Sequence, residues 1–245
     1  MHQTVGAILV LLLLPMAAFS ENAQEVVRSL VGQPLLLAHV ARVGKIKLKA
    51  SHLNKIVGSC DMATLVTAAE WQAGTARIRL RYIGIPVLPN GGSHGCQTDE
   101  ESVLELTGFA ADESGSSVAA AIHQVLQTPE QFLADHGIRC DFPPAPENEK
   151  AVRLSSSMLA PVPLLRVDAN YTETARQKRV SGAVLLRLVV GTDGRAHRVQ
   201  VLRSLGSGLD ENALQVLPLW RFQPGFQGEQ PVAVLTHIQM SFRLL

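Results

Sequence analysis

Residues 182–203 read GAVLLRLVVGTDGRAHRVQVLR, and this pattern predicts a β-hairpin. Apolar side chains occupy alternate positions of Ala183–Val190, as expected for a strand with one buried face. The pair Asp193 and Gly194 is typical of a tight hairpin turn, because both residue types tolerate positive φ angles. We therefore expect Arg195–Arg203 to return as a second, antiparallel strand.

The segments on either side of this hairpin extend it into a helix–strand–strand–helix–strand order. Acidic residues near the N-terminal ends of Thr172–Lys178 and Leu209–Val216 favour two helices. Val232–Leu244 alternates over its whole length and predicts the last and longest strand. The expected fold class is α+β, with a three-stranded antiparallel sheet that carries both helices on one face.

The last strand is long relative to the others, so we expect one of its edges to lie open. An open edge presents unpaired N–H and C=O groups that a strand of another protein can bind. The predicted partner-binding edge consists of Val232, Val234, Leu235, Thr236, His237, Ile238, Gln239 and Ser241. A structural or assembly protein that forms a homodimer through the same edge is the alternative.

Several short motifs follow one another in this part of the chain. They are Tyr171-Thr-Glu-Thr-Ala-Arg176, Asp193-Gly194, Leu209-Asp210 and Trp220-Arg-Phe-Gln-Pro224. Together they resemble the TonB C-terminal domain family over about residues 160–245. The resemblance implies a family-motif core made of Tyr171, Gly182, Gly194, Leu209, Asp210, Trp220, Phe222, Pro224 and Phe242.

The resemblance also implies a function. Members of this family act in the periplasm and bind outer-membrane transporters by strand addition, in TonB-dependent transport. A conventional TonB has a retained membrane helix and a long spacer rich in Pro, Lys and Glu, and this sequence shows neither pattern. We therefore expect a TonB-like protein-binding module of the cell envelope.

The first twenty residues predict the compartment. Val5–Phe19 is a short apolar run, and Ala18 and Ser20 are small residues at the two positions that a signal peptidase must fit. We therefore expect residues 1–20 to be a signal peptide and the protein to be periplasmic. Because Lys and Arg are missing before the run, a short anchor in the inner membrane, with the protein facing the periplasm, is the alternative.

Composition divides the rest of the chain into three parts. Prolines and charges cluster in residues 141–150, and Ser and Pro follow, so we expect a linker over residues 141–159. Residues 21–140 alternate between strand-like and helix-like patterns and predict a separate small α+β domain of unknown role. The TonB-like domain then occupies residues 160–245.

Local signals inside the N-terminal domain predict particular elements. Thr64–Trp71 and Ala76–Ile83 are expected to pair as a hairpin, and Val118–Gln127 has helical spacing. Thr128 and Gln131 predict a capping box at the start of a further helix.

Bulk composition excludes several function classes. Lys plus Arg is 22 and Asp plus Glu is 21, so the net charge of +1 argues against a nucleic-acid-binding protein. Aromatic residues make up only 4% of the chain, which disfavours base-stacking surfaces. The apolar runs are too short for a protein that crosses the membrane repeatedly.

Export makes the cysteines candidates for a disulfide bond. Cys60 and Cys96 lie beside turn residues and are the preferred pair, with three unbonded thiols as the alternative. His94 and Cys96 lack the spacing of a metal site, and no catalytic motif occurs, so we expect no metal, no cofactor and no enzymatic activity. A hydrolase-type enzyme within residues 21–140 is a further alternative.

Overall fold

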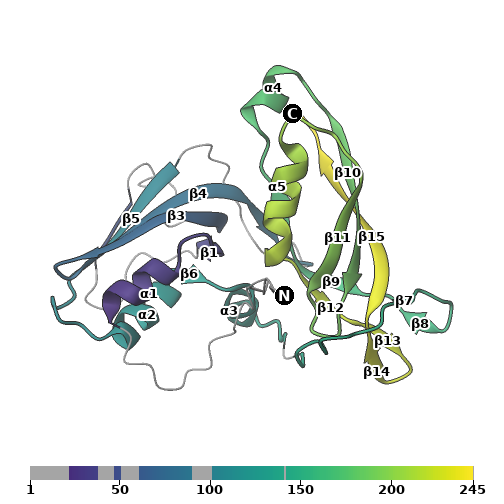
Figure 1. Ribbon diagram of the computed structural model, residues 1–245, viewed down its shortest axis with the longest axis horizontal. Coiled ribbons are helices and arrows are strands. Elements are labelled where there is room, and N and C mark those ends of the chain that lie inside the picture. The colour runs from purple at the N-terminus through teal and green to yellow at the C-terminus, as the bar shows by residue number, and fades with distance from the viewer. Residues whose placement is uncertain (1–21, 38–46, 51–60, 90–100, 141, 245) are drawn as a thin grey trace, which may run out of the picture.

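The computed structural model describes residues 22–37, 47–50, 61–89, 101–140 and 142–244, and it is a mixed α+β structure rich in strands (Figure 1). The elements of the N-terminal part are α1 (Ala23–Ser29), β1 (Pro34–Leu37), β2 (Lys47–Ala50), β3 (Met62–Gln72), β4 (Thr75–Val87), β5 (Glu101–Thr107), α2 (Gly115–His123), β6 (Leu126–Gln127) and α3 (Pro129–Asp135). Those of the C-terminal part are β7 (Val152–Arg153), β8 (Met158–Leu159), β9 (Val162–Ala169), α4 (Glu173–Gln177), β10 (Gly182–Val190), β11 (Ala196–Arg203), α5 (Leu209–Val216), η1 (Leu217–Leu219), β12 (Arg221–Gln223), β13 (Gly225–Gln227), β14 (Gln230–Val232) and β15 (Val234–Phe242).

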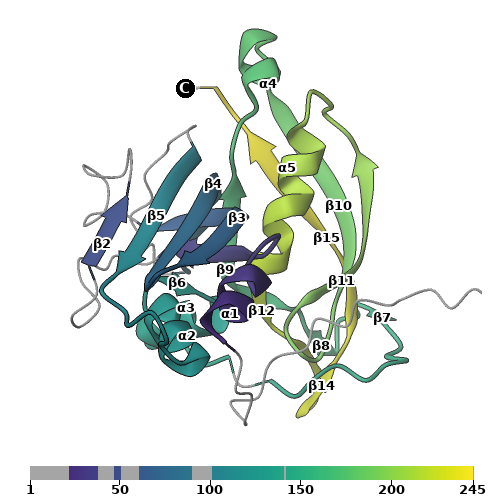
Figure 2. The same ribbon diagram turned by 60° about the vertical axis from the view of Figure 1, so that its left-hand side comes forward.

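The N-terminal part is a sheet of antiparallel strands, with α1 and α2 packed together against it (Figure 1 and Figure 2). The predicted hairpin is confirmed as β3 and β4, and its turn residues Ala73 and Gly74 have φ angles of 45° and 76°. A Cβ atom on Gly74 would lie 2.3 Å from the Phe109 carbonyl oxygen, so this turn requires glycine. Ile78 and Leu80 of β4 are buried in the first core, beneath the two helices.

For helices α2 and α3, one prediction is confirmed and the other is wrong at one end. The capping box of α3 is confirmed, because Gln131 N donates to Thr128 Oγ1 at 3.3 Å and Thr128 N donates to Gln131 Oε1 at 2.9 Å. The expected helix over Val118–Gln127 is wrong at its end, since α2 stops at His123 and Leu126–Gln127 forms β6. β6 pairs with β1, so contact with a distant strand decides this boundary.

The C-terminal part has the expected order of α4, β10, β11, α5 and β15. Residues of α4 and α5 share one core with β10 and β15, so both helices cover the same face of the sheet. The sheet has four strands where three were expected, in the order β11-β10-β15-β7. The fourth strand, β7, comes from the predicted linker, which runs back along the start of β15 and pairs with it in parallel.

Strand β4 joins the two parts of the chain into one sheet. Its first half pairs with β5, and residues 84–87 pair on the same edge with residues 166–169 of β9. The sequence predicted a separate small domain before the linker, whereas the structure shares a sheet between the two parts. The physical reason is length, because β4 has 13 residues and β5 only 7, which leaves room for β9 on that edge. That residues 21–140 fold on their own stays a prediction.

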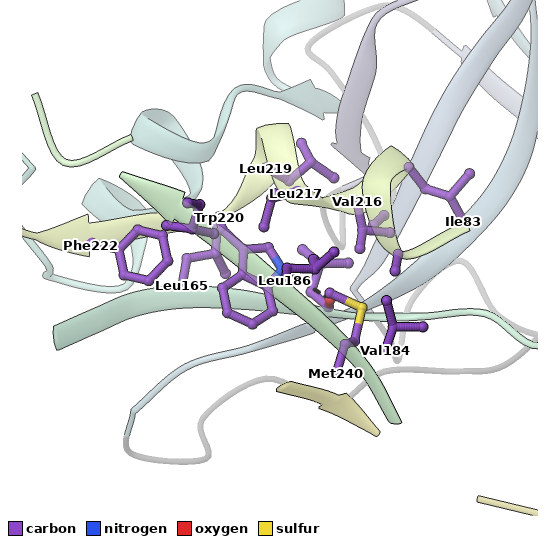
Figure 3. Close-up of a cluster of buried hydrophobic side chains, with 14 of the residues drawn as sticks. Ile83, Leu165, Val184, Leu186, Val216, Leu217, Leu219, Trp220, Phe222 and Met240 are labelled. Atoms are coloured by element: carbon purple, nitrogen blue, oxygen red, sulfur yellow. Dashed lines mark hydrogen bonds between the residues drawn. The ribbon is translucent and has the colours of Figure 1, made fainter. Parts of the chain in front are cut away.

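The second core lies where the two parts meet (Figure 3). It combines Ile83 of β4 with Leu165 of β9, Leu186 of β10 and Trp220. The indole Nε1 of Trp220 donates a buried hydrogen bond to the Val167 carbonyl oxygen at 3.1 Å. Because burial of apolar surface is the main stabilising term in folding, this core holds the C-terminal helices against the N-terminal sheet.

The expected last strand, Val232–Leu244, is interrupted near its start. Gln230–Val232 forms β14, which pairs with β13 before β15 begins. Val232 lies opposite Gly225 and is therefore not part of the predicted edge, which corrects its assignment. Pro231 has no N–H to donate, so it suits a short ribbon at the sheet margin better than a continuous ladder.

Several predictions fall on residues whose structure is not described. Residues 1–20, with the predicted signal peptide, lie outside the described residues, as do Cys60, His94 and Cys96. In the part of the chain that the structure covers, no helix is long and apolar enough to cross a membrane. The same part contains no group of three or more His, Cys, Asp or Glu side chains placed to hold a metal ion.

Candidate partner-binding edge

Strand β15 has one buried face and one face toward solvent, as its alternation predicted. It pairs with β10 along its whole length without a shift in register. Met240 and Phe242 are buried on one face, whereas His237 and Gln239 are exposed on the other. The other predicted edge residues on this strand are buried Val234, half-buried Leu235, Thr236 and Ile238, and exposed Ser241.

Among the described residues, the edge of β15 that faces away from β10 is paired only at its start. There β7 pairs in parallel, with Val152 opposite Val234 and Arg153 opposite Leu235. Over residues 236–242 this edge has no strand partner among the described residues. It therefore offers a regular row of backbone donors and acceptors, which is the feature that strand addition needs.

The register shows which backbone groups point to the open edge. The Val152 N–H donates to the Ala233 carbonyl oxygen at 2.9 Å, so the backbone groups of Ala233 face β7. Backbone groups of successive residues alternate between the two edges of a strand. Those of His237, Gln239 and Ser241 therefore face the open edge, and those of the residues between them face β10.

The chain before β7 is anchored on the turn between β10 and β11. Glu149 Oε1 accepts hydrogen bonds from the Thr192 N–H at 3.1 Å and from the Thr192 hydroxyl at 2.5 Å. The Arg198 guanidinium donates to the carbonyl oxygen of Glu149. These bonds direct the chain onto the start of β15 and explain why the predicted linker supplies a strand.

The aromatic residues of the family-motif core pack behind this edge. Trp220 and Phe222 are buried, with ring centroids 5.9 Å apart. Tyr171 meets Phe242 of β15 edge-on at 5.7 Å, and its hydroxyl donates to the Val180 carbonyl oxygen at 2.5 Å. These contacts fix the position of β15 from its buried face.

The polar and small residues of the motif core shape the turns. The Asp210 carboxylate accepts hydrogen bonds from the Leu205 and Gly206 N–H groups at 3.0 and 2.9 Å. Burial alone would raise the pKa of Asp210, but its hydrogen bonds lower that pKa overall. Gly194 has a φ of 70°, and a Cβ atom there would lie 2.4 Å from the Phe222 carbonyl oxygen. The remaining motif residues are buried Leu209 and Pro224, and Gly182 beside the end of β15.

One charged cluster joins residues that are far apart in the sequence and was not predicted. Glu130 Oε1 accepts hydrogen bonds from Arg221 Nε at 2.7 Å and from Arg195 Nη2 at 2.8 Å. Arg221 is only 4% exposed, so its charge is compensated in a buried position. Burial alone would raise the pKa of Glu130, but the charges of Arg221 and Arg195 lower that pKa overall. No local pattern links α3 to the Trp-Arg-Phe motif, and only the fold brings them together.

Comparison with known proteins first identifies the class of the C-terminal part. Residues 168–244 match the family model described as the Gram-negative bacterial TonB protein C-terminal. The match runs from the end of β9 to the residues after β15 and includes the open edge. It confirms the resemblance that the sequence motifs indicated for this part of the chain.

A segment of the chain is also similar to a particular protein, Protein TonB of Vibrio cholerae serotype O1 (strain ATCC 39315 / El Tor Inaba N16961). The two are 31% identical over 80 residues, which is 32% of this chain and 33% of that protein. The chain therefore matches about a third of the length of this curated relative.

Proposed function

We propose that this chain is an exported, TonB-like protein of the bacterial cell envelope that binds an extended segment of another envelope protein. The observation that carries the proposal is the open edge of β15 inside the region that matches the TonB C-terminal family. A partner strand pairs with residues 236–242, and its main-chain hydrogen bonds provide the affinity. An outer-membrane transporter is the partner to which the family points, and the role is binding in the periplasm, without catalysis.

The other edge of this sheet, on β11, suits strand addition less well. The pairing of β11 with β10 shifts its register twice, and Arg198 of β11 has a φ of 50°. Irregularities of this kind bend an edge and prevent regular pairing with another chain. Since β15 pairs with β10 without a shift, we assign partner binding to β15.

A proline at Gln239 tests this proposal. Gln239→Pro removes an N–H that faces the open edge and leaves the bonds to β10 in place, so we expect the fold to survive. The probes are synthetic peptides that span the periplasm-facing segments of outer-membrane transporters from the bacterium that encodes this chain. Calorimetric titration should show binding at least about tenfold weaker for Gln239→Pro than for the natural chain.

Gln239→Ala is the matched control, because it shortens the side chain and keeps the backbone donor. We expect Gln239→Ala to bind the peptides as the natural chain does. Unchanged binding by Gln239→Pro, with a normal thermal melting curve, would contradict the proposal. Light scattering without any peptide tests the alternative. A natural chain that is a dimer and a Gln239→Pro variant that is a monomer would favour homodimer formation through this edge.

A further inference from the structure

A shallow pocket of about 320 Å³ lies on the solvent face of the C-terminal sheet, where the edge of β15 becomes open. Its lining residues come from three neighbouring strands: Arg153 of β7, Arg187 of β10, and Leu235 and His237 of β15. Three of these four side chains are basic. We propose that this pocket binds a carboxylate side chain of the extended segment that adds to β15. This inference rests on the proposed function and specifies the chemistry of its partner.

The register places the pocket beside the first open position of the edge. Arg153 lies opposite Leu235, and Arg187 lies opposite His237. β7 ends at Arg153, so no described strand residue stands opposite His237 on the other side. An added strand in line with β7 places a residue there, with its Cβ about 5 Å from that of His237 and on the same face of the sheet. Its side chain therefore enters the pocket.

The charge of the pocket selects the kind of side chain. The Arg187 guanidinium donates to the amide oxygen of Gln200 on β11 and is therefore directed away from the open edge. Arg153, on the same side of β15 as the added strand, is the arginine that can meet its side chain. Arginine side chains bind carboxylates through short, charge-assisted hydrogen bonds. A lysine or arginine of the partner at this position would meet the like charge of Arg153, which disfavours it.

Attachment to a strand explains why a carboxylate on a protein suits this site better than a free anion. The pocket is open to solvent, and exposed ion pairs are weak by themselves. Backbone pairing with residues 236–242 holds the side chain at the pocket and raises its effective concentration. The source to which we commit is therefore an acidic residue of the partner strand.

Two peptides test the proposal on the purified chain. Both are acetylated and amidated, with the sequences Thr-Val-Glu-Val-Thr-Val and Thr-Val-Gln-Val-Thr-Val, and binding is followed by the shifts of backbone amide signals in NMR. We expect the Kd of the Glu peptide to be at least about fivefold lower than that of the Gln peptide. Free acetate at the same concentrations should cause no saturable shift.

The variant Arg153→Gln should bind the two peptides equally, because it removes the cation that lies on the same side of β15 as the added strand. Arg79→Gln is the matched control, since Arg79 is an exposed arginine on β4, remote from this pocket, and should keep the preference for Glu. Arg187→Gln is a second control, because the Arg187 guanidinium is directed toward Gln200 of β11, and this variant should also keep the preference for Glu.

The outcomes separate the two proposals. Equal binding of the Glu and Gln peptides to the natural chain, with shifts along β15, would overturn the pocket proposal. It would still agree with strand addition to β15. A preference for Glu that survives Arg153→Gln would also overturn the pocket proposal. If neither peptide shifts the β15 signals, edge pairing itself fails and the pocket proposal fails with it.

Discussion

His197 on β11 shows how one titratable side chain stabilises the turn that precedes its strand. Its Nε2 lies 2.9 Å from Asp193 Oδ1. The hydrogen bond to Asp193 raises the pKa of His197 above its usual value and outweighs burial, which lowers it. Burial alone would raise the pKa of Asp193, but the hydrogen bond from His197 lowers it overall. The pair is therefore most stable when His197 carries a proton.

This pair predicts a loss of stability as the pH rises. The folded protein holds the His197 proton more tightly than the unfolded chain does, so the stabilisation is fully present below the unfolded pKa of about 6.5. It is lost as the pH rises through the raised, folded-state pKa. We expect the urea midpoint to fall more from about pH 6 to about pH 8 in the natural protein than in His197→Gln. The same pH dependence in both proteins would contradict the pairing.

At the scale of elements, β7 is a strand of only two residues that covers the start of the outer edge of β15. Its two backbone donors point in opposite directions. The Val152 N–H donates to the carbonyl oxygen of Ala233, the residue directly before β15, so alternation turns the Arg153 N–H away from β15. Two neighbouring proline substitutions therefore have different expected effects.

Val152→Pro should release β7, whereas Arg153→Pro should leave its pairing in place. The parallel register makes the Leu235 N–H a donor to β7, so this amide loses protection when β7 leaves. We expect hydrogen exchange at Leu235 to be about tenfold or more faster in Val152→Pro than in Arg153→Pro. Equal exchange rates in the two variants would show that this ladder does not hold β7.

At the scale of the whole molecule, the two parts of the chain share apolar and charged contacts. The second core includes Phe132 and Leu133 of α3 as well as residues of the TonB-type region. Glu130 of the same helix binds the buried Arg221. The C-terminal part is thus fixed on the N-terminal part, which sets where the open edge points.

Removing the Glu130 carboxylate should destabilise the whole molecule. Glu130→Ala leaves the charge of Arg221 buried without its acidic partner, and we expect the free energy of unfolding to fall by about 2–3 kcal/mol. Urea denaturation measures this change.

Glu105→Ala is the control for this prediction. Glu105 binds Arg77 at 2.9 Å, but the Arg77 side chain is 57% exposed, so the expected loss is below about 1 kcal/mol. Equal losses in the free energy of unfolding would contradict the prediction that breaking the Glu130–Arg221 pair costs more than breaking an exposed ion pair.

The elements with local signals could be predicted from the order of the amino acids alone. The β10–β11 hairpin follows from alternation and its turn residues, helix α5 from the acidic residues at its start, and the α3 capping box from Thr128 and Gln131. All of these signals act between neighbouring residues. The ordered motifs were enough to indicate the TonB-type region, which the family match confirms.

The pairing of the strand edges, in contrast, depends on contacts between distant parts of the chain. It placed β9 beside β4, gave β15 a partner at its start in β7, moved Val232 into β14, and joined Glu130 to Arg221. Alternation shows which face of a strand is buried, but the backbone groups at its two edges are alike in every sequence. Which edge stays open depends on the strands that burial of the shared core brings together.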